Sequence, residues 1–412
     1  MSDVDALKAR AGEVVDELRD ELVELSSKMH ADVELAFEEV KASGWITDLL
    51  QAHGLRVERG LGSLPTAFRA TAGSAGPRLA YLCEYDGLPG YGQSCGHNVV
   101  AAAGVGAAIA LASVIDQLDG TVIALGTPGE EGSGGKYILE REGFFADVDA
   151  MMLIYPGMYN VAHSRAVGAV MATFEFFGRA AHAAARPELG VNALDAMLLA
   201  FQGINALRQQ LPGDVRVHGI IDKGGTLPQV IPDHTAARIM VRANHGTTLD
   251  EVVPRLDRCL EGAALMTGTR LERSWRTRAE GAQPLLSNEV LAAAFADNLA
   301  GLGREVRPRE ELSGAWSGDT GAISWLVPTI QPQLAMTGTD VAPHSHEFHA
   351  ASASPEAAAC IIDAAKAMTM TGIDLLANPR LMSDVRAEFA RGSEGELHPH
   401  ASDLHRRRFR AV

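Results

Sequence analysis

The sequence predicts an α/β fold, in which a doubly wound, mostly parallel sheet is interrupted by an inserted α+β satellite domain. Short apolar strands alternate with helices between about residues 78 and 157, which is typical of a parallel sheet covered by helices. Longer strands then replace this alternation for more than a hundred residues before it returns. The expected domains are therefore 1–165 together with 281–412, and an insertion at 166–280.

The elements of the first domain follow from periodicity. Apolar residues recur at helical spacing over 4–29, which predicts an amphipathic helix. Strands are expected near 78–89, 121–128 and 149–157, and a helix over about 98–117 lies between the first two. The second and third strands are continuous apolar runs, typical of strands buried on both faces of a parallel sheet.

The insertion has a different pattern. A long strand begins near 166, and a glycine-bounded loop and a helix follow it. Two further strands, "VRVHGIIDKGG" and "TAARIMVRANH", precede a helix over about 248–267 and a strand near 271–277. The α/β pattern then returns and includes a helix from 354 to about 376, while the polar tail is expected to fray.

Charge and composition exclude several classes of protein. The net charge is −16, from 36 basic and 52 acidic residues, whereas a nucleic-acid-binding protein normally carries a basic stripe. The N-terminus has no apolar segment of a secretory signal, and no uninterrupted apolar run is long enough to span a membrane. The four cysteines are widely separated, which favours a reduced, cytoplasmic protein.

Polar residues follow the predicted strands, where ligands bind in open α/β sheets. They are Glu84, Asp86, Cys95, His97, Glu130, Glu131 and Tyr155, with His344, His346 and His349 in a late loop. Thiolate, imidazole and carboxylate groups at one edge of a sheet favour a divalent transition-metal site. Alternatives stay open: Cys95 could be a nucleophile, the Cys-Gly-His segment a tight turn, and the glutamate pair a solvated loop.

The adjacent glutamates favour hydrolytic chemistry. Neighbouring residues on a loop point in different directions, so one carboxylate can bind a metal ion while the other holds a water molecule. A metal ion acidifies such a water, and the second glutamate can then act as general base. The glycines around the pair allow the backbone to approach a ligand closely.

Five segments together resemble the metallopeptidase and amidohydrolase family of aminoacylases and glutamate carboxypeptidases. The closest branch contains hippurate, auxin-conjugate and aminobenzoyl-glutamate hydrolases, and the resemblance covers about residues 26–380. The segments are "MHADVELAFEEV", "CEYDGLPGYGQSCGHN", "GTPGEEGSGGK", "GRAAHAAARPELGVNALDA" and "APHSHEF". The resemblance implies a metal-binding catalytic domain and a satellite domain that mediates dimerisation, so a homo-oligomer, a dimer or higher, is expected.

The resemblance also implies a role for each matching residue. Cys95, His97, Glu131 and His344 take the places of metal ligands, and Glu130 takes the place of the general base. Asp86 resembles the carboxylate that orients a ligating histidine. His182 resembles a satellite-domain histidine that stabilises negative charge on the substrate, often in the partner's active site. The implied metal is manganese or zinc, with cobalt or nickel also compatible with the ligands.

Two residues depart from the family pattern. Tyr155 stands where the branch usually has a metal-binding histidine, and a phenol is a poor ligand near neutral pH. We therefore expect one metal ion per chain, or a weak second site. Gln229 stands where an asparagine usually contacts the carboxylate of an amino-acid product. Gln229 and Tyr155 are therefore expected to contact the substrate. Arg186 and Arg242 are candidates to bind a substrate carboxylate.

Three functional hypotheses follow, and the two catalytic ones involve a small-molecule substrate. The first is hydrolysis of a C–N bond in an aromatic, carboxylate-bearing substrate by aryl-amine deamination, as in a family member that converts 5-nitroanthranilate to 5-nitrosalicylate and ammonia. The second is an amidohydrolase or peptidase that cleaves N-acyl or aminobenzoyl amino acids. The third is a non-catalytic binding protein, which Glu130 argues against because a binding protein needs no general base.

Overall fold

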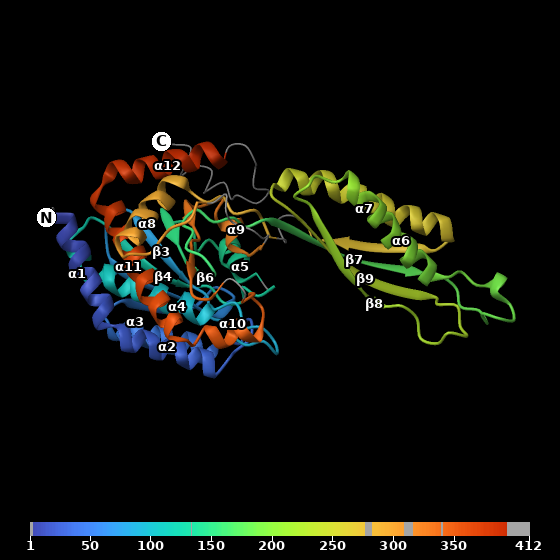
Figure 1. The fold of residues 1–412 in the computed structure, drawn as a ribbon, viewed down its shortest axis with the longest axis horizontal. Helices are drawn as coiled ribbons and strands as arrows, with labels where there is room; N and C mark the ends of the chain where they lie inside the picture. Colours follow the sequence, from blue (N-terminus) through green and yellow to red (C-terminus); the bar gives the residue numbers. More distant parts are fainter. Residues whose placement is uncertain (1–2, 133, 277–281, 309–315, 339–340, 394–412) are drawn as a thin grey trace.

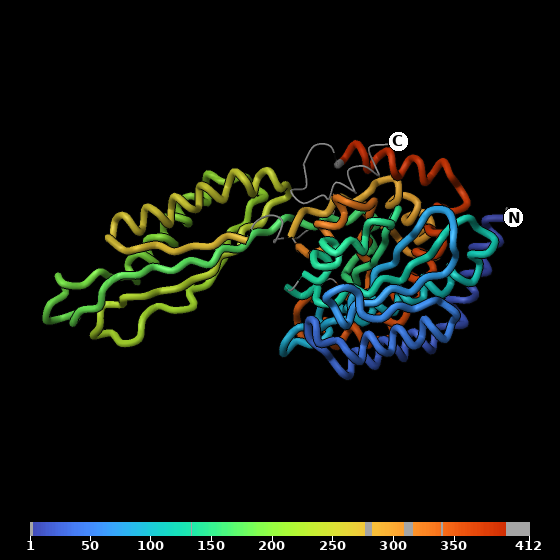
Figure 2. Tube along the Cα trace, turned by 180° about the vertical axis from the view of Figure 1, so that it is seen from behind, coloured from blue at the N-terminus to red at the C-terminus, as the bar shows by residue number. Residues whose placement is uncertain are grey.

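The computed structural model describes residues 3–132, 134–276, 282–308, 316–338 and 341–393. Figure 1 shows a rounded main body from which one long unit projects. We call the projecting part, residues 168–275, the satellite unit, and the other described residues the main body. The described chain begins and ends on the main body, so the satellite unit is inserted within it (Figure 2).

The main body is built on a six-stranded sheet with the order β1-β2-β4-β3-β5-β11. The four strands β4, β3, β5 and β11 run parallel, whereas β2 is antiparallel to β4 and to the edge strand β1. The strands are β1 (Arg56–Leu61), β2 (Leu64–Gly73), β3 (Arg78–Cys83), β4 (Thr121–Gly126), β5 (Ala150–Met152) and β11 (Thr329–Ile330). A separate two-stranded sheet pairs β6 (Tyr155–Gly157) with β12 (Gln333–Ala335).

Helices cover this sheet, as expected for a doubly wound fold. The helix α4 (His97–Ala112) is buried along its whole length except for its last residue, because α11 (Pro355–Ala377) and α2 pack over it. The remaining helices are α1 (Asp3–Glu17), α2 (Arg19–Ala31), α3 (Val40–Ala52), α5 (Gly135–Arg141), α8 (Glu289–Gly301), α9 (Thr320–Ile323), α10 (His346–Ala351) and α12 (Pro379–Ser393). No described helix combines the length and apolar character needed to cross a bilayer.

The satellite unit is a four-stranded antiparallel sheet with the order β10-β7-β9-β8. Two helices pack on one face of it and form a second, separate hydrophobic core. Its elements are β7 (Gly168–Phe177), α6 (Ala193–Leu207), β8 (Arg216–Lys223), β9 (His234–Ala243), α7 (Gly246–Thr267) and β10 (Arg270–Trp275). This architecture, a parallel-rich α/β body with an inserted α+β unit, confirms the predicted fold class.

Two predicted elements are divided in the structure. The helix expected over 4–29 is interrupted at Leu18; α1 packs mainly on α11, whereas α2 packs mainly on α4. The strand expected over 149–157 becomes β5 and β6, which pair in different sheets. Pro156 has no amide hydrogen to donate within a continuous central strand, so the chain leaves the main sheet before it.

Candidate metal centre and active site

Polar residues gather at the carboxyl end of the parallel strands. β3 and β4 are parallel neighbours, so the residues that follow them lie side by side. The loop before α10 reaches the same edge, where the His344 amide donates to the Ser94 carbonyl at 2.9 Å. The residues gathered there are Glu84, Asp86, Cys95, His97, Glu130, Glu131, Tyr155 and His344.

Gly96 explains why a glycine separates Cys95 from His97. Its φ of 78° lies in the left-handed region, and a Cβ atom there would lie 2.4 Å from Cγ of Pro156. Only glycine tolerates both conditions without strain. The turn lets α4 begin at His97, which is fully buried, while Cys95 lines the adjacent cavity.

Asp86 fixes the orientation of the His97 ring. Its Oδ1 lies 3.0 Å from His97 Nδ1, and its Oδ2 accepts a hydrogen bond from the Glu131 amide at 2.9 Å. Burial acts to lower the pKa of His97, but the charges of Cys95 and Asp86 and its hydrogen bonds to them outweigh burial and raise it. The Nε2 atom is thereby directed toward the other gathered side chains, as a ligating histidine requires.

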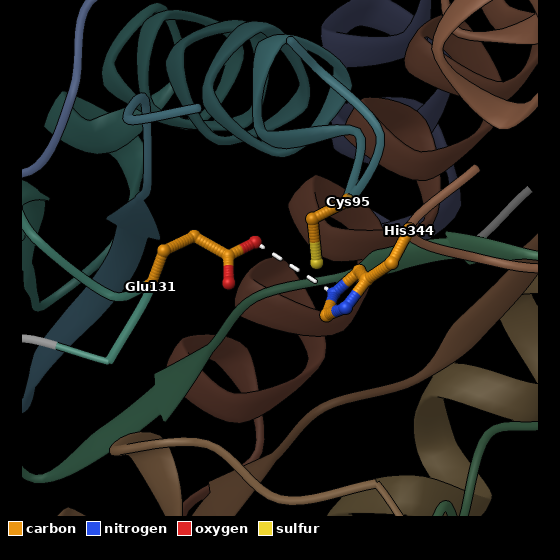
Figure 3. A group of neighbouring side chains, drawn as sticks. All are labelled: Cys95, Glu131 and His344. Carbon is orange, nitrogen blue, oxygen red and sulfur yellow. Dashed lines mark ion pairs between the residues drawn. The ribbon is translucent and has the colours of Figure 1, made fainter. Parts of the chain in front are cut away.

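The candidate metal-binding atoms form two groups that share Glu131. Donor atoms of Cys95, Glu131 and His344 lie within 4.8 Å of one another, and so do those of His97, Glu130 and Glu131. Figure 3 shows the first group, in which three side chains from three segments point toward a common space. The four predicted ligands are therefore adjacent in space, although the first and last of them lie 249 positions apart in the chain (344 − 95).

These residues fit a divalent transition metal. Glu131 Oε1 is buried without a hydrogen-bond partner among the described residues, and it lies 3.8 Å from His344 Nε2. His344 has a φ of 62°, a strained conformation for a residue with a side chain, and such strain is concentrated at functional sites. Sulfur, nitrogen and oxygen donors in this combination suit zinc and its neighbours in the first transition series.

Tyr155 lies inside the same cluster. Its hydroxyl is 3.3 Å from His97 Nε2, and its ring stacks on Trp316 with centroids 5.6 Å apart. Burial raises the pKa of the phenol well above its ordinary value, and the carboxylates of Glu130 and Glu84 act in the same direction. The residue that departs from the family pattern is thus a neutral hydroxyl beside a candidate metal ligand.

A buried ion-pair cluster that the sequence did not predict lies beneath the site. Lys136 is fully buried, and its ammonium lies 2.6 Å from Glu84 Oε1 and 2.6 Å from Asp319 Oδ1. Glu84 Oε2 in turn lies 3.4 Å from His97 Nε2. One feature of the sequence could have indicated this cluster: a lysine follows the "EEGSGG" loop at the start of a largely apolar segment. A lysine that is buried there needs acidic partners, because lysine is rarely buried without one.

A cavity of about 470 Å³ opens beside the candidate metal-binding residues. Its walls include Cys95, Glu130, Tyr155 and Trp316 from the main body, and Arg242 from the satellite unit. Arg242 pairs with Ala169 at the end of β9 that adjoins the main body, and burial lowers the pKa of its guanidinium. Of the candidates for binding a substrate carboxylate, the structure therefore brings Arg242 to the site.

Three other predicted residues lie at the opposite end of the satellite unit. β7 leaves the main body near Gly168 and ends at Phe177, a length of about 30 Å for ten residues. Beyond it, His182 bridges to Val230, and the Ala183 amide donates to the Gln229 carbonyl. Arg186 follows on this same exposed tip and pairs with Glu188. His182, Arg186 and Gln229 are therefore not brought to the candidate metal centre within one chain.

His346 and His349 also lie apart from the candidate ligands. The His346 ring stacks on Tyr91, and the His349 ring stacks on His30 with centroids 4.1 Å apart. The His349 Nδ1 atom accepts a hydrogen bond from the Gln93 amide at 3.0 Å. These contacts hold α10 against the loop that carries Cys95, and they give both histidines a packing role.

Comparison with known proteins identifies the family. A profile of the M20 peptidase dimerisation domain matches residues 165–265. Over 405 residues the chain is 36% identical to the Xaa-Arg dipeptidase of Mus musculus, a match that covers 94% of this chain and 93% of the dipeptidase. The chain belongs to the M20 peptidase family. It is also 34% identical to one chain of the p-aminobenzoyl-glutamate hydrolase of Escherichia coli (strain K12), over 72% of this chain and 67% of that one.

Solved structures show the same M20 fold. A Bacillus subtilis protein described as a dinuclear metal-binding peptidase of the M20 family superposes with a TM-score of 0.66 and 19% identity, covering 88% of this chain and 99% of that one. The M20 relatives are named as enzymes, which confirms that this chain is a hydrolase acting on C–N bonds and sets aside the non-catalytic hypothesis. The names give no support to the aryl-amine deamination that was suggested by Tyr155.

Proposed function

We propose that this M20 enzyme hydrolyses the amide bond of an N-acyl or aminobenzoyl amino acid, or of a dipeptide. The observation that carries the proposal is the position of Glu130, which lies beside the Cys95–Glu131–His344 group and lines the same cavity as Arg242. A carboxylate next to three metal-ligating side chains is suited to activate water. A guanidinium in the same cavity is suited to bind a substrate carboxylate, and Tyr155 and Trp316 provide an aromatic wall.

The proposed cofactor is one divalent transition-metal ion per chain, manganese or zinc, with cobalt or nickel also compatible. Cys95, Glu131 and His344 would hold it, with His97 adjacent, and Tyr155 supports a count of one because it removes a nitrogen ligand beside His97. When bound, the ion supplies Lewis acidity to water and to the substrate carbonyl. Asp86 keeps the Nε2 atom of His97 directed at this position.

Glu130 performs the proposed proton transfers. It takes a proton from water as the water oxygen bonds to the carbonyl carbon. The same carboxyl then delivers that proton to the nitrogen as the C–N bond breaks, which yields a carboxylic acid and an amine. Gly318 allows this position, because a Cβ atom there would lie 2.5 Å from Glu130 Oε1.

A second copy of the chain is proposed to complete the site. His182 lies about 30 Å or more from its own metal centre, since it follows the far end of β7. A partner could bring its own His182 to this centre, with Arg186 and Gln229 beside it. The exposed edge strand β8 supports association: it carries Ile220 and Ile221, which are 55% and 41% exposed, and unpaired strand edges favour pairing with another chain.

We also propose a division of the chain into two domains. Residues 1–165 and 281–412 would form the catalytic domain, and 166–280 the dimerisation domain; the boundary at 280/281 and the tail beyond 393 lie outside the described residues. We also place the protein in the cytoplasm, because its four cysteines are all free, which suits a reducing compartment.

Removal of the metal is expected to abolish amide hydrolysis, and readdition of zinc or manganese is expected to restore it. Elemental analysis should give about one ion per chain, and replacement of His344 by alanine should weaken metal binding by more than about 100-fold, since even partners outside the ligand shell contribute about 10- to 100-fold. His346→Ala is the matched control on the same segment and should retain the metal. Equal metal loss in both variants would contradict the ligand assignment.

Mixed dimers test whether His182 acts in the partner's site. His182→Ala and Glu130→Gln should each be nearly inactive as pure proteins. After random exchange of chains, about a quarter of wild-type activity should return, because half of the dimers are mixed and each mixed dimer has one intact site. If both residues act within one chain, no mixed dimer contains an intact site and no activity returns.

A further inference from the structure

We propose that the Tyr155 hydroxyl is a catalytic hydrogen-bond donor to the substrate oxygen that becomes negatively charged during amide hydrolysis. This inference rests on the proposed amide hydrolysis and names a role for one of its residues. It differs from the metal-binding role of the histidine that usually stands at this position in the family branch, because here the hydroxyl meets the substrate directly.

The position of Tyr155 is fixed from two sides. Its backbone pairs with β12, where the Tyr155 amide donates to the Pro332 carbonyl at 2.8 Å. Its ring lies nearly parallel to the Trp316 ring, with an interplanar angle of 15°. A donor held in this way loses little freedom when it meets its acceptor, and such preorganisation is what makes a hydrogen bond effective in catalysis.

The hydroxyl lies beside the candidate metal centre. It lies 3.3 Å from His97 Nε2, and Tyr155 lines the same cavity as Cys95, Glu130 and Glu131. A carbonyl group attacked by a water beside Glu130 would therefore have its oxygen within the region bounded by Tyr155.

The chemical step balances without an additional reactant. As the water oxygen bonds to the carbonyl carbon, the electron pair of the C=O double bond moves onto the carbonyl oxygen, and the Tyr155 hydroxyl donates a hydrogen bond to it. Tyr155 keeps its proton throughout. When the C–N bond breaks, the electron pair re-forms the double bond and Glu130 delivers its proton to the nitrogen.

The substitution Tyr155→Phe tests this role because it removes a single oxygen atom and keeps the ring that stacks on Trp316. We expect kcat to fall by about 10²- to 10³-fold, the effect of removing one oxyanion donor, while KM and the metal content stay unchanged. The dissociation constant of a phosphinate analogue of the tetrahedral intermediate, measured by calorimetry, should rise by a similar factor, and that of the product amino acid should not. Tyr81→Phe is the control, since it removes a buried hydroxyl that bonds the Met368 carbonyl far from the cavity.

The outcomes separate the inference from the proposed function. If wild type hydrolyses amides but Tyr155→Phe keeps its kcat and its affinity for the phosphinate, the inference is overturned and the proposed function stands. If Tyr155→Phe loses the metal, the hydroxyl acts through the metal site and the inference is also overturned. If metal-loaded wild type hydrolyses no amide of these classes, both the proposed function and the inference fail.

Discussion

Replacing Glu130 by glutamine is expected to lower kcat by about 10²- to 10⁴-fold, the range of general acid–base catalysis, with the metal still bound. The amide keeps the size of the side chain but cannot accept a proton from water. Glu130 Oε2 lies 3.7 Å from His97 Nε2, and its side chain is 9% exposed, so bulk water has little access to replace it. The measurements are kcat, KM and metal content per chain.

Glu131→Gln is the matched comparison because it changes the neighbouring residue in the same way. Glu131 belongs to both groups of donor atoms, so this variant should lose metal, whereas Glu130→Gln should lose turnover and retain metal. The opposite pattern would exchange the two roles. If Glu130→Gln keeps kcat within about threefold of wild type, well below the range for a lost general base, Glu130 is not the base.

Replacing Lys136 by methionine is expected to lower the free energy of unfolding by about 3–5 kcal/mol, the usual effect of removing one partner from a buried ion pair. The ammonium lies between Glu84 and Asp319, whose side chains are 0% and 3% exposed. Methionine fills a similar volume but leaves both carboxylates without their cation. Denaturant unfolding of wild type and variant measures the difference.

Lys366→Met is the control for this prediction. Its ammonium also lies 2.6 Å from a carboxylate, Asp16, but the Asp16 side chain is 52% exposed, so the loss should be below about 1 kcal/mol. Glu84→Gln and Asp319→Asn, added to Lys136→Met, should recover part of the lost stability because they remove the uncompensated charges. If Lys136→Met and Lys366→Met lower the free energy of unfolding equally, Lys136 does not neutralise the two buried carboxylates as proposed.

Much of the candidate site could be predicted from the sequence because its residues belong to local motifs. Cys95 and His97 flank a glycine whose left-handed φ the turn requires, and Glu130 with Glu131 follows an apolar strand. Parallel strands bring their carboxyl ends to one edge of a sheet, so motifs that follow different strands lie together. The same rule placed Tyr155 beside them, although it could not show that the hydroxyl approaches His97.

The tertiary structure alone decided which residues share an environment. Lys136 pairs with Asp319 across 183 positions of the chain, and no periodicity links them. The order of the residues likewise could not show that Arg242 lies at the end of β9 that adjoins the main body. Nor could it show that His182 follows the end of the neighbouring strand β7 that lies away from the main body.

The sequence by itself thus determined the α/β body, the inserted α+β unit and the local ligand motifs, because these depend on apolar periodicity and on short segments. The buried ion cluster, the cavity beside Tyr155 and the distance of His182 from its own centre were decided only by the folded chain. These features depend on how separate segments pack against one another. Packing brings together residues that are far apart in the chain, and the order of the residues does not specify which of them will meet.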